Sequence, residues 1–264
     1  MATYTTEIAS DKIASDNPIH QRLLRAYYLA IPYIKGNLLE LGCGEGRGVE
    51  LLAPLANSYV ALDKIQSVID ELKSKYQDLD FRQAVFPPFS DLADNSFDSI
   101  VSFQVIEHVK KDKDFLKEIY RVLKPGGKAI LTTPNIKKTL TRNPWHVREY
   151  TAQQLTDLAS EIFSKVEMKG VTGNEKVMAY YEENKRSVQK ITRFDIFNLQ
   201  YNLPAPLLRI PYDILNRLNR NKLNDGNTKL VNEISQEDYP LTDDADTALD
   251  LFLVLEKTNL SAES

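Results

Sequence analysis

Hydrophobic and polar positions follow two patterns along the chain. Short, nearly continuous apolar runs predict buried strands at residues 37–41, 58–63, 79–85, 97–103, 128–134, 163–171 and 248–257. Between them, apolar residues three or four apart predict helices after Asn17-Pro18, at residues 49–55, 65–76 and 112–123, and from Thr151 onward. Asn17 is expected to cap the first helix, and the spacing of Thr151 and Gln154 predicts a capping box.

Strands that alternate with helices through short loops are typical of an α/β fold. We expect a Rossmann-like, mostly parallel sheet of seven strands with helices on both faces. The alternation breaks between residues 174 and 247, where we expect a helical insertion before the last strand. The chain thus divides into an N-terminal helical segment (1–36), a core (37–173), the insertion (174–247), and a final strand with a tail (248–264).

The composition is that of an ordinary globular protein, with 42% hydrophobic and 27% charged residues. No apolar run approaches the roughly 20 residues that cross a bilayer, and the N-terminus lacks the pattern of a signal peptide. The single cysteine, Cys43, excludes an internal disulfide and favours a reducing cytoplasm. A net charge of −4 gives no electrostatic reason to expect a nucleic-acid partner.

Charge is unevenly distributed within the insertion. Residues 185–222 contain eight Lys and Arg but only two acids, Asp195 and Asp213, among many aromatic and aliphatic residues. The apolar positions could pack on the core, cap an acceptor site, or form a basic and apolar surface that rests peripherally on a membrane. The sequence leaves these three alternatives open.

A glycine-rich turn, LGCGEGRG, follows the first predicted strand. The dinucleotide fingerprint G-x-G-x-x-G needs a small residue at position 47, where this chain has Arg47. A pyrophosphate would also be repelled by Glu40 and Glu45, at a cost of about 1 kcal/mol or more per close pair. The turn therefore favours a cationic ligand with a free amino group over a phosphate.

Asp63 ends the second predicted strand, 21 positions after Gly42. An acid at this spacing can accept hydrogen bonds from the ribose hydroxyls of a nucleoside. The alternative is a cap for the helix that begins at Ile65. The loops at 42–48, 63–64, 84–89 and 103–108 are expected to converge beyond the carboxyl ends of the parallel strands.

Four collinear stretches between Leu38 and Asn135 carry a family resemblance: LLELGCGEGRG, VALD, PFSDLADNSFDSIVSFQVIEHV and LKPGGKAILTTPN. In this order they resemble class I S-adenosylmethionine-dependent methyltransferases, and most closely the small-molecule branch that contains the ubiquinone-biosynthesis enzymes. The resemblance implies S-adenosylmethionine as methyl donor, S-adenosylhomocysteine as product, and residues 37–173 as the cofactor-binding core.

The resemblance also implies individual cofactor contacts. Glu40 would orient the methionine amino end, Asp63 would take the ribose hydroxyls, and Gln104 would line the floor beneath the methionine. Gln83 stands where the family commonly has an acid that reads the adenine amino group. The full implied cofactor set is Glu40, Gly42, Cys43, Gly44, Gly46, Asp63, Lys64, Ile65, Ala84, Val85, Phe103 and Gln104.

Two histidines are candidates for catalysis. Glu107-His108 resembles the end of a Glu-x-x-Glu-His motif that helps bind a divalent metal in some relatives. Gln104 replaces its first acid here, so we expect no metal. The alternative to a catalytic His108 is that it packs in the helix after the fourth strand, near the methyl-transfer site. In NPWHVREYT, His146 could be a general base toward a hydroxyl.

The same stretch offers candidates for acceptor binding. Arg148 could hold an anionic group, and Trp145 and Tyr150 could contact the acceptor. The competing interpretation is a structural loop in which Glu149 and Tyr150 fix the next helix.

The sequence thus predicts an S-adenosylmethionine-dependent methyltransferase that acts on a small-molecule or glycan- or lipid-linked acceptor, with transfer to oxygen favoured. N- or C-methylation of a metabolite is one alternative, and a non-catalytic cofactor-binding domain acting through the insertion is another. None of these motifs specifies the acceptor or an oligomeric state.

Overall fold

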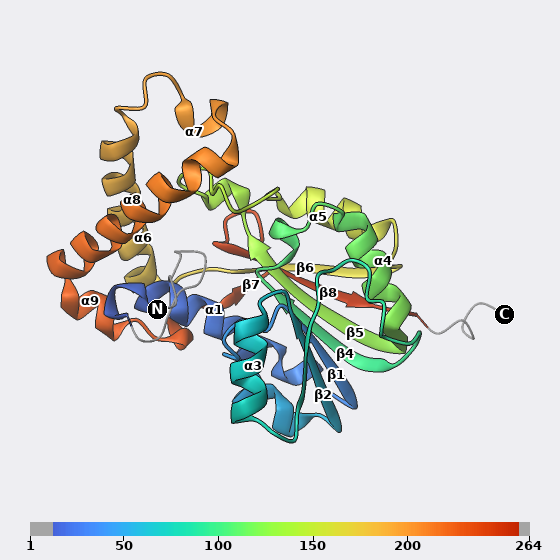
Figure 1. The fold of residues 1–264 in the computed structure, drawn as a ribbon. Coiled ribbons are helices and arrows are strands. Elements are labelled where there is room, and N and C mark those ends of the chain that lie inside the picture. Colours follow the sequence, from blue (N-terminus) through green and yellow to red (C-terminus); the bar gives the residue numbers. More distant parts are fainter. Residues whose placement is uncertain (1–12, 259–264) are drawn as a thin grey trace.

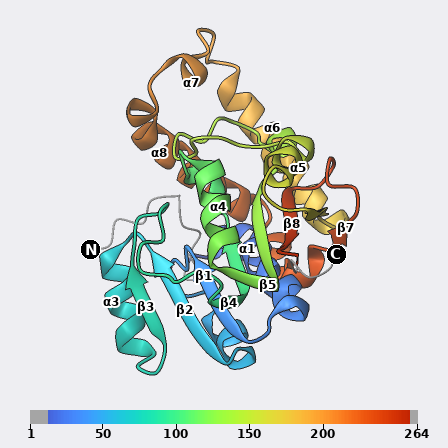
Figure 2. The same ribbon diagram turned by 90° about the vertical axis from the view of Figure 1, so that its right-hand side faces the viewer.

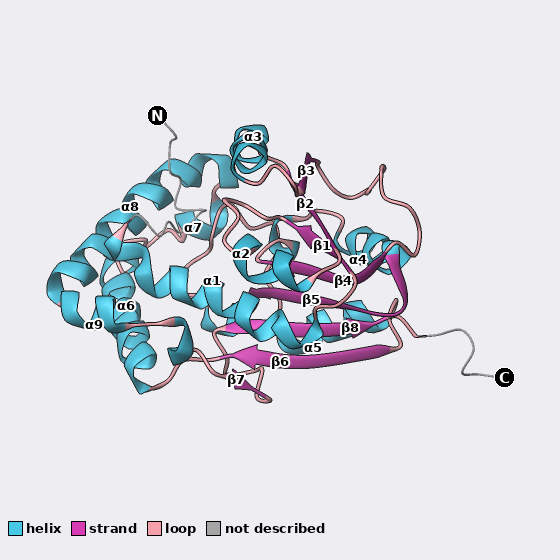
Figure 3. Ribbon diagram, turned by 90° about the horizontal axis from the view of Figure 1, so that it is seen from below, coloured by secondary structure: helices cyan, strands magenta, loops and turns pink. Residues whose placement is uncertain are grey.

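A computed structural model describes residues 13–258 of the chain (Figure 1). Over these residues the protein forms one sheet of eight strands in the order β3-β2-β1-β4-β5-β8-β6-β7, which Figure 3 shows side by side. Strands β1 to β5 pair in parallel, whereas β8 runs antiparallel between β5 and β6. The strands are β1 (Asn37–Leu41), β2 (Ser58–Asp63), β3 (Asp80–Gln83), β4 (Phe97–Phe103), β5 (Leu123–Pro134), β6 (Lys165–Val171), β7 (Leu241–Thr242) and β8 (Asp250–Glu256).

The seven expected strands are all present, and the described chain adds β7 as an eighth. β7 has two residues and pairs with β6 at the edge of the sheet. A strand this short shows no alternation of polar and apolar residues, so the sequence pattern could not predict it.

Helices cover both faces because alternate strand residues point to opposite sides. Leu38 packs in one buried cluster with residues of α1, α2 and α3, while Leu39 packs in the other with residues of α4 and α5. The helices of this core are α1 (Asn17–Ala30), α2 (Val49–Leu52), α3 (Gln66–Lys75), α4 (Asp112–Val122) and α5 (Ala152–Ser160). The expected α/β sandwich is therefore confirmed.

The helix starts are partly as predicted. At α5 the capping box forms, because Thr151 Oγ1 accepts from the Gln154 amide and Gln154 Oε1 accepts from the Thr151 amide. The predicted cap at Asn17 is wrong. Asn17 is the first residue of α1, and its side-chain amide donates to the carbonyls of Val231 and Ile234, at 2.7 and 2.9 Å. A tertiary contact to a distant segment thus uses the side chain that was expected to cap the helix.

The insertion between β6 and β8 forms most of the remaining structure. Its helices are α6 (Glu175–Thr192), α7 (Leu199–Asn202), α8 (Ala205–Gly226) and α9 (Thr228–Glu233). Figures 1 and 2 both show α7 and the loop between α6 and α7 as the parts of the insertion farthest from the sheet. Within residues 13–258, no helix is long and apolar enough to cross a membrane.

Candidate functional site

The glycine-rich turn after β1 is tied to the neighbouring strand. The amides of Gly42 and Cys43 both donate to the carbonyl of Leu62 on β2, at 2.7 and 3.2 Å. Burial raises the pKa of the Cys43 thiol, so this side chain stays protonated and packs in the core. The turn is therefore held as a fixed loop at the carboxyl end of the sheet.

Gly44 differs from the other glycines of the turn in what surrounds it. A Cβ at Gly42 would lie 2.4 Å from Val105, and one at Gly46 would lie 2.5 Å from Leu72, so protein packing accounts for both glycines. A Cβ at Gly44 would meet no atom within 4 Å, and its φ of +49° is also unusual for a side chain. The turn thus leaves a small cradle of open space at Gly44.

Asp63 lies next to this cradle, at the end of β2. Its Oδ2 accepts from the Gly44 amide and its Oδ1 from the Ile65 amide, both at 3.0 Å. The carboxylate therefore fixes the glycine turn and also the residue before α3, which is close to the helix-cap alternative. The ribose role stays a prediction. Each oxygen keeps a further lone pair with which it could accept a ligand hydroxyl.

Glu40, on β1 two residues before Gly42, is enclosed by protein. It is 1% exposed and accepts from the hydroxyls of Tyr27 on α1 and Tyr59 on β2. Burial raises the pKa of Glu40 to about 7, although both tyrosine hydrogen bonds act to lower it. The sequence analysis missed the two tyrosines, because they occupy positions that the spacing assigned to apolar packing.

The other expected cofactor residues lie at the carboxyl ends of β2, β3 and β4. The Ala84 amide donates to the Asp63 carbonyl at 2.8 Å, and Val85 is exposed beside it. Gln83 donates its side-chain amide to the Lys64 carbonyl, at 3.1 Å.

At the end of β4, the Phe103 ring packs edge-on to Tyr27, with centroids 4.7 Å apart. Gln104 follows with a positive φ of 57°, and its amide donates to the Thr132 carbonyl at 2.9 Å. This backbone conformation is uncommon for a residue other than glycine, and such positions are enriched at functional sites.

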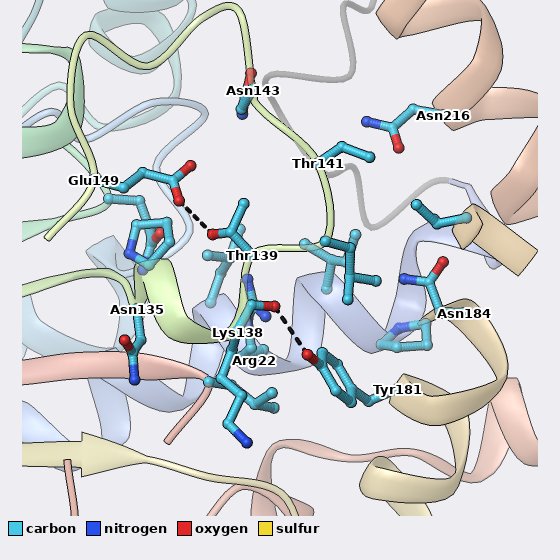
Figure 4. A pocket seen from close by; sticks show the side chains of 18 of the residues that line it. Arg22, Asn135, Lys138, Thr139, Thr141, Asn143, Glu149, Tyr181, Asn184 and Asn216 are labelled. Carbon is cyan, nitrogen blue, oxygen red and sulfur yellow. Dashed lines mark hydrogen bonds between the residues drawn. The ribbon is translucent and has the colours of Figure 1, made fainter. Parts of the chain in front are cut away.

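Gln104 also lines a cavity of about 270 Å³ between the carboxyl ends of β4 and β5 and the helices α1, α6 and α8. Its lining is rich in neutral amide and hydroxyl groups, several of which Figure 4 shows around the open space. The residues that contribute amide and hydroxyl groups to the lining include Asn135, Thr139, Thr141, Asn143, Asn184, Tyr212, Asn216 and Asn219. The sequence analysis did not identify those from α6 and α8, although polar residues recur at helical spacing at 212, 216 and 219.

The two arginines that line the cavity are paired with acids. Arg22 lies 3.1 Å from Asp250, and Arg220 lies 3.0 Å from Asp16. The Asn219 side chain is buried and donates to Asn184 at 2.7 Å, while its Oδ1 has no hydrogen-bond partner among the described residues. The cavity thus presents neutral hydrogen-bonding groups, two arginines whose charges are compensated by acids, and Lys138.

Both candidate catalytic histidines line the cavity, and their rings meet edge to face with centroids 4.9 Å apart. His146 Nδ1 lies 2.6 Å from Glu149 Oε1, and its Nε2 lies 2.8 Å from the Asn143 side-chain amide. An amide NH₂ can only donate, so the neutral His146 ring carries its proton on Nδ1 and accepts at Nε2.

His108 is oriented by the backbone. Its Nδ1 lies 2.9 Å from the Trp145 carbonyl, which can only accept. The neutral ring therefore carries its proton on Nδ1 and its lone pair on Nε2.

Glu107 adds a buried carboxyl group to the histidine pair. Its Oε2 accepts from Thr133 Oγ1 at 2.9 Å, and its Oε1 has no hydrogen-bond partner among the described residues. Burial raises the pKa of Glu107 to about 7. Glu107, His108 and His146 each place one possible ligand atom within 4.8 Å of the others, so these three residues could together hold a metal ion. The sequence analysis counted only the first two, because it could not place the loop that carries His146.

The candidate acceptor residues of the same loop point elsewhere. Arg148 and Tyr150 both bind the Asp112 carboxylate of α4, the hydroxyl of Tyr150 at 2.9 Å, and neither lines the cavity. The Trp145 indole donates to Asp213 at 3.2 Å and lies under the Arg209 guanidinium, 4.2 Å from the ring centroid. These contacts fix the loop to α4 and α8. The structural interpretation expected Glu149 and Tyr150 to fix the next helix, but Tyr150 binds α4, and Glu149 binds Thr139 and His146 instead.

Known proteins match the first half of the sheet most clearly. A family model described as a methyltransferase domain matches residues 39–131. A probable S-adenosylmethionine-dependent methyltransferase of Mycolicibacterium smegmatis is 36% identical over 136 residues, or 50% of this chain and 52% of that protein. The mitochondrial ubiquinone biosynthesis O-methyltransferase of Dictyostelium discoideum is 29% identical over 143 residues, or 49% of this chain and 41% of that protein. The chain thus spans about half the length of the curated relatives it matches.

Solved structures extend the similarity to nearly the whole chain at the level of the fold. A Thermotoga maritima protein, named as an S-adenosylmethionine-dependent methyltransferase and possible histamine N-methyltransferase, aligns with a TM-score of 0.56 at 17% identity. The alignment covers 93% of this chain and 91% of that one. The Rossmann-like architecture is confirmed by this agreement.

Proposed function

We propose that the chain is a class I S-adenosylmethionine-dependent methyltransferase, which the methyltransferase-domain match and the Mycolicibacterium smegmatis relative support, and that it transfers a methyl group to a hydroxyl oxygen of a small-molecule or glycan- or lipid-linked acceptor. One observation carries the proposal. The open cradle at Gly44, beside Asp63, lies at the same end of the sheet as an amide-lined cavity, and Gln104 follows β4 there and lines that cavity.

The residues around the cradle fit the cofactor. S-adenosylmethionine, when bound, supplies a methyl group that its sulfonium has already activated. The missing side chain of Gly44 leaves room for a ligand against the backbone, and the Asp63 carboxylate can accept from ribose hydroxyls. Gln104 would line the site between cofactor and acceptor. The protein then contributes mainly alignment of the acceptor oxygen with the methyl group.

The lining of the cavity supports a polyhydroxylated or otherwise neutral acceptor. Amide groups such as those of Asn184 and Asn216 both donate and accept hydrogen bonds, which matches a hydroxyl-rich ligand. The similarity to the Dictyostelium discoideum protein, which is named as a ubiquinone biosynthesis O-methyltransferase, supports transfer to oxygen. A lipid-linked acceptor is supported by the exposed apolar side chains of α8, the helix whose polar residues line the cavity.

His108 is the candidate base that we test. Its ring proton is on Nδ1, which faces the Trp145 carbonyl, so a proton from an acceptor hydroxyl would go to Nε2. Both ring nitrogens of His146 are engaged, with Glu149 and Asn143, so His146 would position its neighbours.

Calorimetry with S-adenosylhomocysteine tests the cofactor site. The wild-type protein is expected to bind it, and Asp63→Ala to weaken binding about tenfold or more, because hydrogen bonds to a charged group are lost. Asp70→Ala is the matched control, since Asp70 is an exposed acid of α3 whose carboxylate accepts from the Gln66 side chain. Absence of binding to the wild type would refute the proposed function.

A transfer assay tests the base. With a panel of glycan and lipid acceptors, release of S-adenosylhomocysteine should fall at least tenfold in His108→Ala, because general-base catalysis contributes 10²–10⁴-fold. Affinity for S-adenosylhomocysteine should stay unchanged in the same variant. Turnover equal to that of the wild type would exclude His108 as the base.

A further inference from the structure

The helix α8 exposes an apolar stripe along its outer side. Leu207, Ile210, Ile214, Leu215 and Leu218 are each between 47 and 72% exposed. Their spacing of three and four residues places them on one side of the helix. A helix of a globular protein normally buries such a stripe, so this one is unusual.

The opposite side of α8 is polar and faces inward. Tyr212, Asn216 and Asn219 line the cavity, and Arg217 and Arg220 both bind the buried Asp16. Over residues 207–220 the amphipathicity of α8 is therefore inverted, with polar residues toward the protein and apolar residues toward the outside, whereas Leu223 near the end of the helix is buried in the core. Packing on the core, one of the three alternatives for the insertion, is wrong for these apolar residues.

The segment that leads into α8 extends the apolar surface. Phe194, Ile196 and Phe197 are between 71 and 77% exposed. They lie in the stretch between α6 and α7, at the outer end of the insertion in Figures 1 and 2. We call these three residues, together with the stripe on α8, the α7–α8 face.

Exposed charge from residue 184 to residue 224, the sequence that carries the α7–α8 face, has one sign, and the exposed acids Glu182 and Asp225 lie just outside this stretch. Between residues 184 and 224, the exposed charged residues are Arg186, Lys190, Arg193 and Lys222. The two acids of this stretch are engaged, since Asp195 accepts from the Leu199 and Gln200 amides and Asp213 from Trp145. Of the eight Lys and Arg in residues 185–222, four are therefore exposed, and no exposed acid lies between them in the sequence.

We propose that the α7–α8 face docks on a lipid bilayer that contains anionic lipids. The apolar side chains would enter the interfacial layer, and the exposed cations would contact lipid phosphates. A second copy of the chain fits this surface less well, because a symmetric contact would bring the same cations toward one another. The docking does not depend on the proposed methyl transfer.

Co-sedimentation with vesicles tests the proposal. The full chain is expected to bind vesicles of phosphatidylcholine with phosphatidylglycerol, and to bind pure phosphatidylcholine about tenfold or more weakly. Lys190→Glu with Arg193→Glu should lower binding to the anionic vesicles about tenfold or more. Lys73→Glu with Lys117→Glu is the matched control, because these exposed lysines of α3 and α4 change the net charge equally and lie outside the face.

A second variant tests the apolar contribution. Ile210→Ser with Ile214→Ser and Leu218→Ser should also lower vesicle binding about tenfold or more, whereas the exposed Leu55→Ser should not. Unchanged S-adenosylhomocysteine binding and melting temperature would show that each variant is folded. Equal binding of the wild type to neutral and anionic vesicles, or no binding to either, would overturn the proposal. A second result would also overturn it: sedimentation velocity shows a dimer of the wild type, and the triple serine variant abolishes the dimer but still binds vesicles.

Discussion

Two buried carboxyl groups, Glu40 and Glu107, lie at the carboxyl ends of the parallel strands. Burial raises the pKa of each from 4.5 to about 7. In the folded protein each group keeps its proton over a pH range in which the unfolded chain has released it. The contribution of each protonated group to the free energy of unfolding is fully present below about pH 4.5. It is lost as the pH rises to about 7, the pKa in the folded protein.

Glu107→Gln should remove part of this pH dependence. The amide keeps the shape of the protonated carboxyl group and cannot ionise, so the variant avoids the cost of a buried charge. Its free energy of unfolding should exceed that of the wild type by about 1–3 kcal/mol near pH 8 and equal it near pH 5. Urea unfolding at the two pH values measures the difference. A difference that is the same at both would contradict the protonation argument.

For single residues, the sequence indicated candidate site residues better than it indicated the side chains that contact them. Gly44 and Asp63 could be identified from a strand, a glycine turn and an acid at fixed spacing, because that signal is local. The hydroxyls of Tyr27 and Tyr59 around Glu40 could not, since three different elements bring these side chains together. The same holds for His146, whose contact with His108 depends on a loop.

Among the elements, α8 separates what periodicity can predict from what it cannot. Apolar residues at helical spacing indicate a helix and the relative positions of its two faces. They do not indicate which face turns inward. In α8 the buried Asp16, which binds Arg217 and Arg220, fixes the polar face against the protein. The choice is therefore made by a residue about 200 positions away.

Asp16→Ala should weaken the attachment of α8. Arg220 is buried, and without Asp16 it would keep an uncompensated charge, which costs about 3–5 kcal/mol of unfolding free energy. Asp225→Ala is the control, because Asp225 is an exposed acid of the same helix. Urea unfolding of both variants measures the effect. Equal stability of the two would show that the cluster does not hold the helix.

For the whole molecule, the order of strands and helices was predictable because alternation is repeated many times along the chain. The cavity was not, because it combines α1, the loop after β5 and two helices of the insertion. The family match ends at residue 131, so it supplies no information about the insertion either. The acceptor site thus depends on how two distant parts of one chain pack, which neither local pattern nor family membership specifies.

The inverted α8 also reverses which of its substitutions the fold should tolerate. In most helices, apolar positions resist exchange and polar positions vary freely. Here a selection for folding alone would retain Asn219 and Arg220, which are buried, and would let Ile210 and Leu218 drift to polar residues. If natural variants nevertheless keep those two positions apolar, the constraint must come from outside the folded chain, from whatever surface the helix meets.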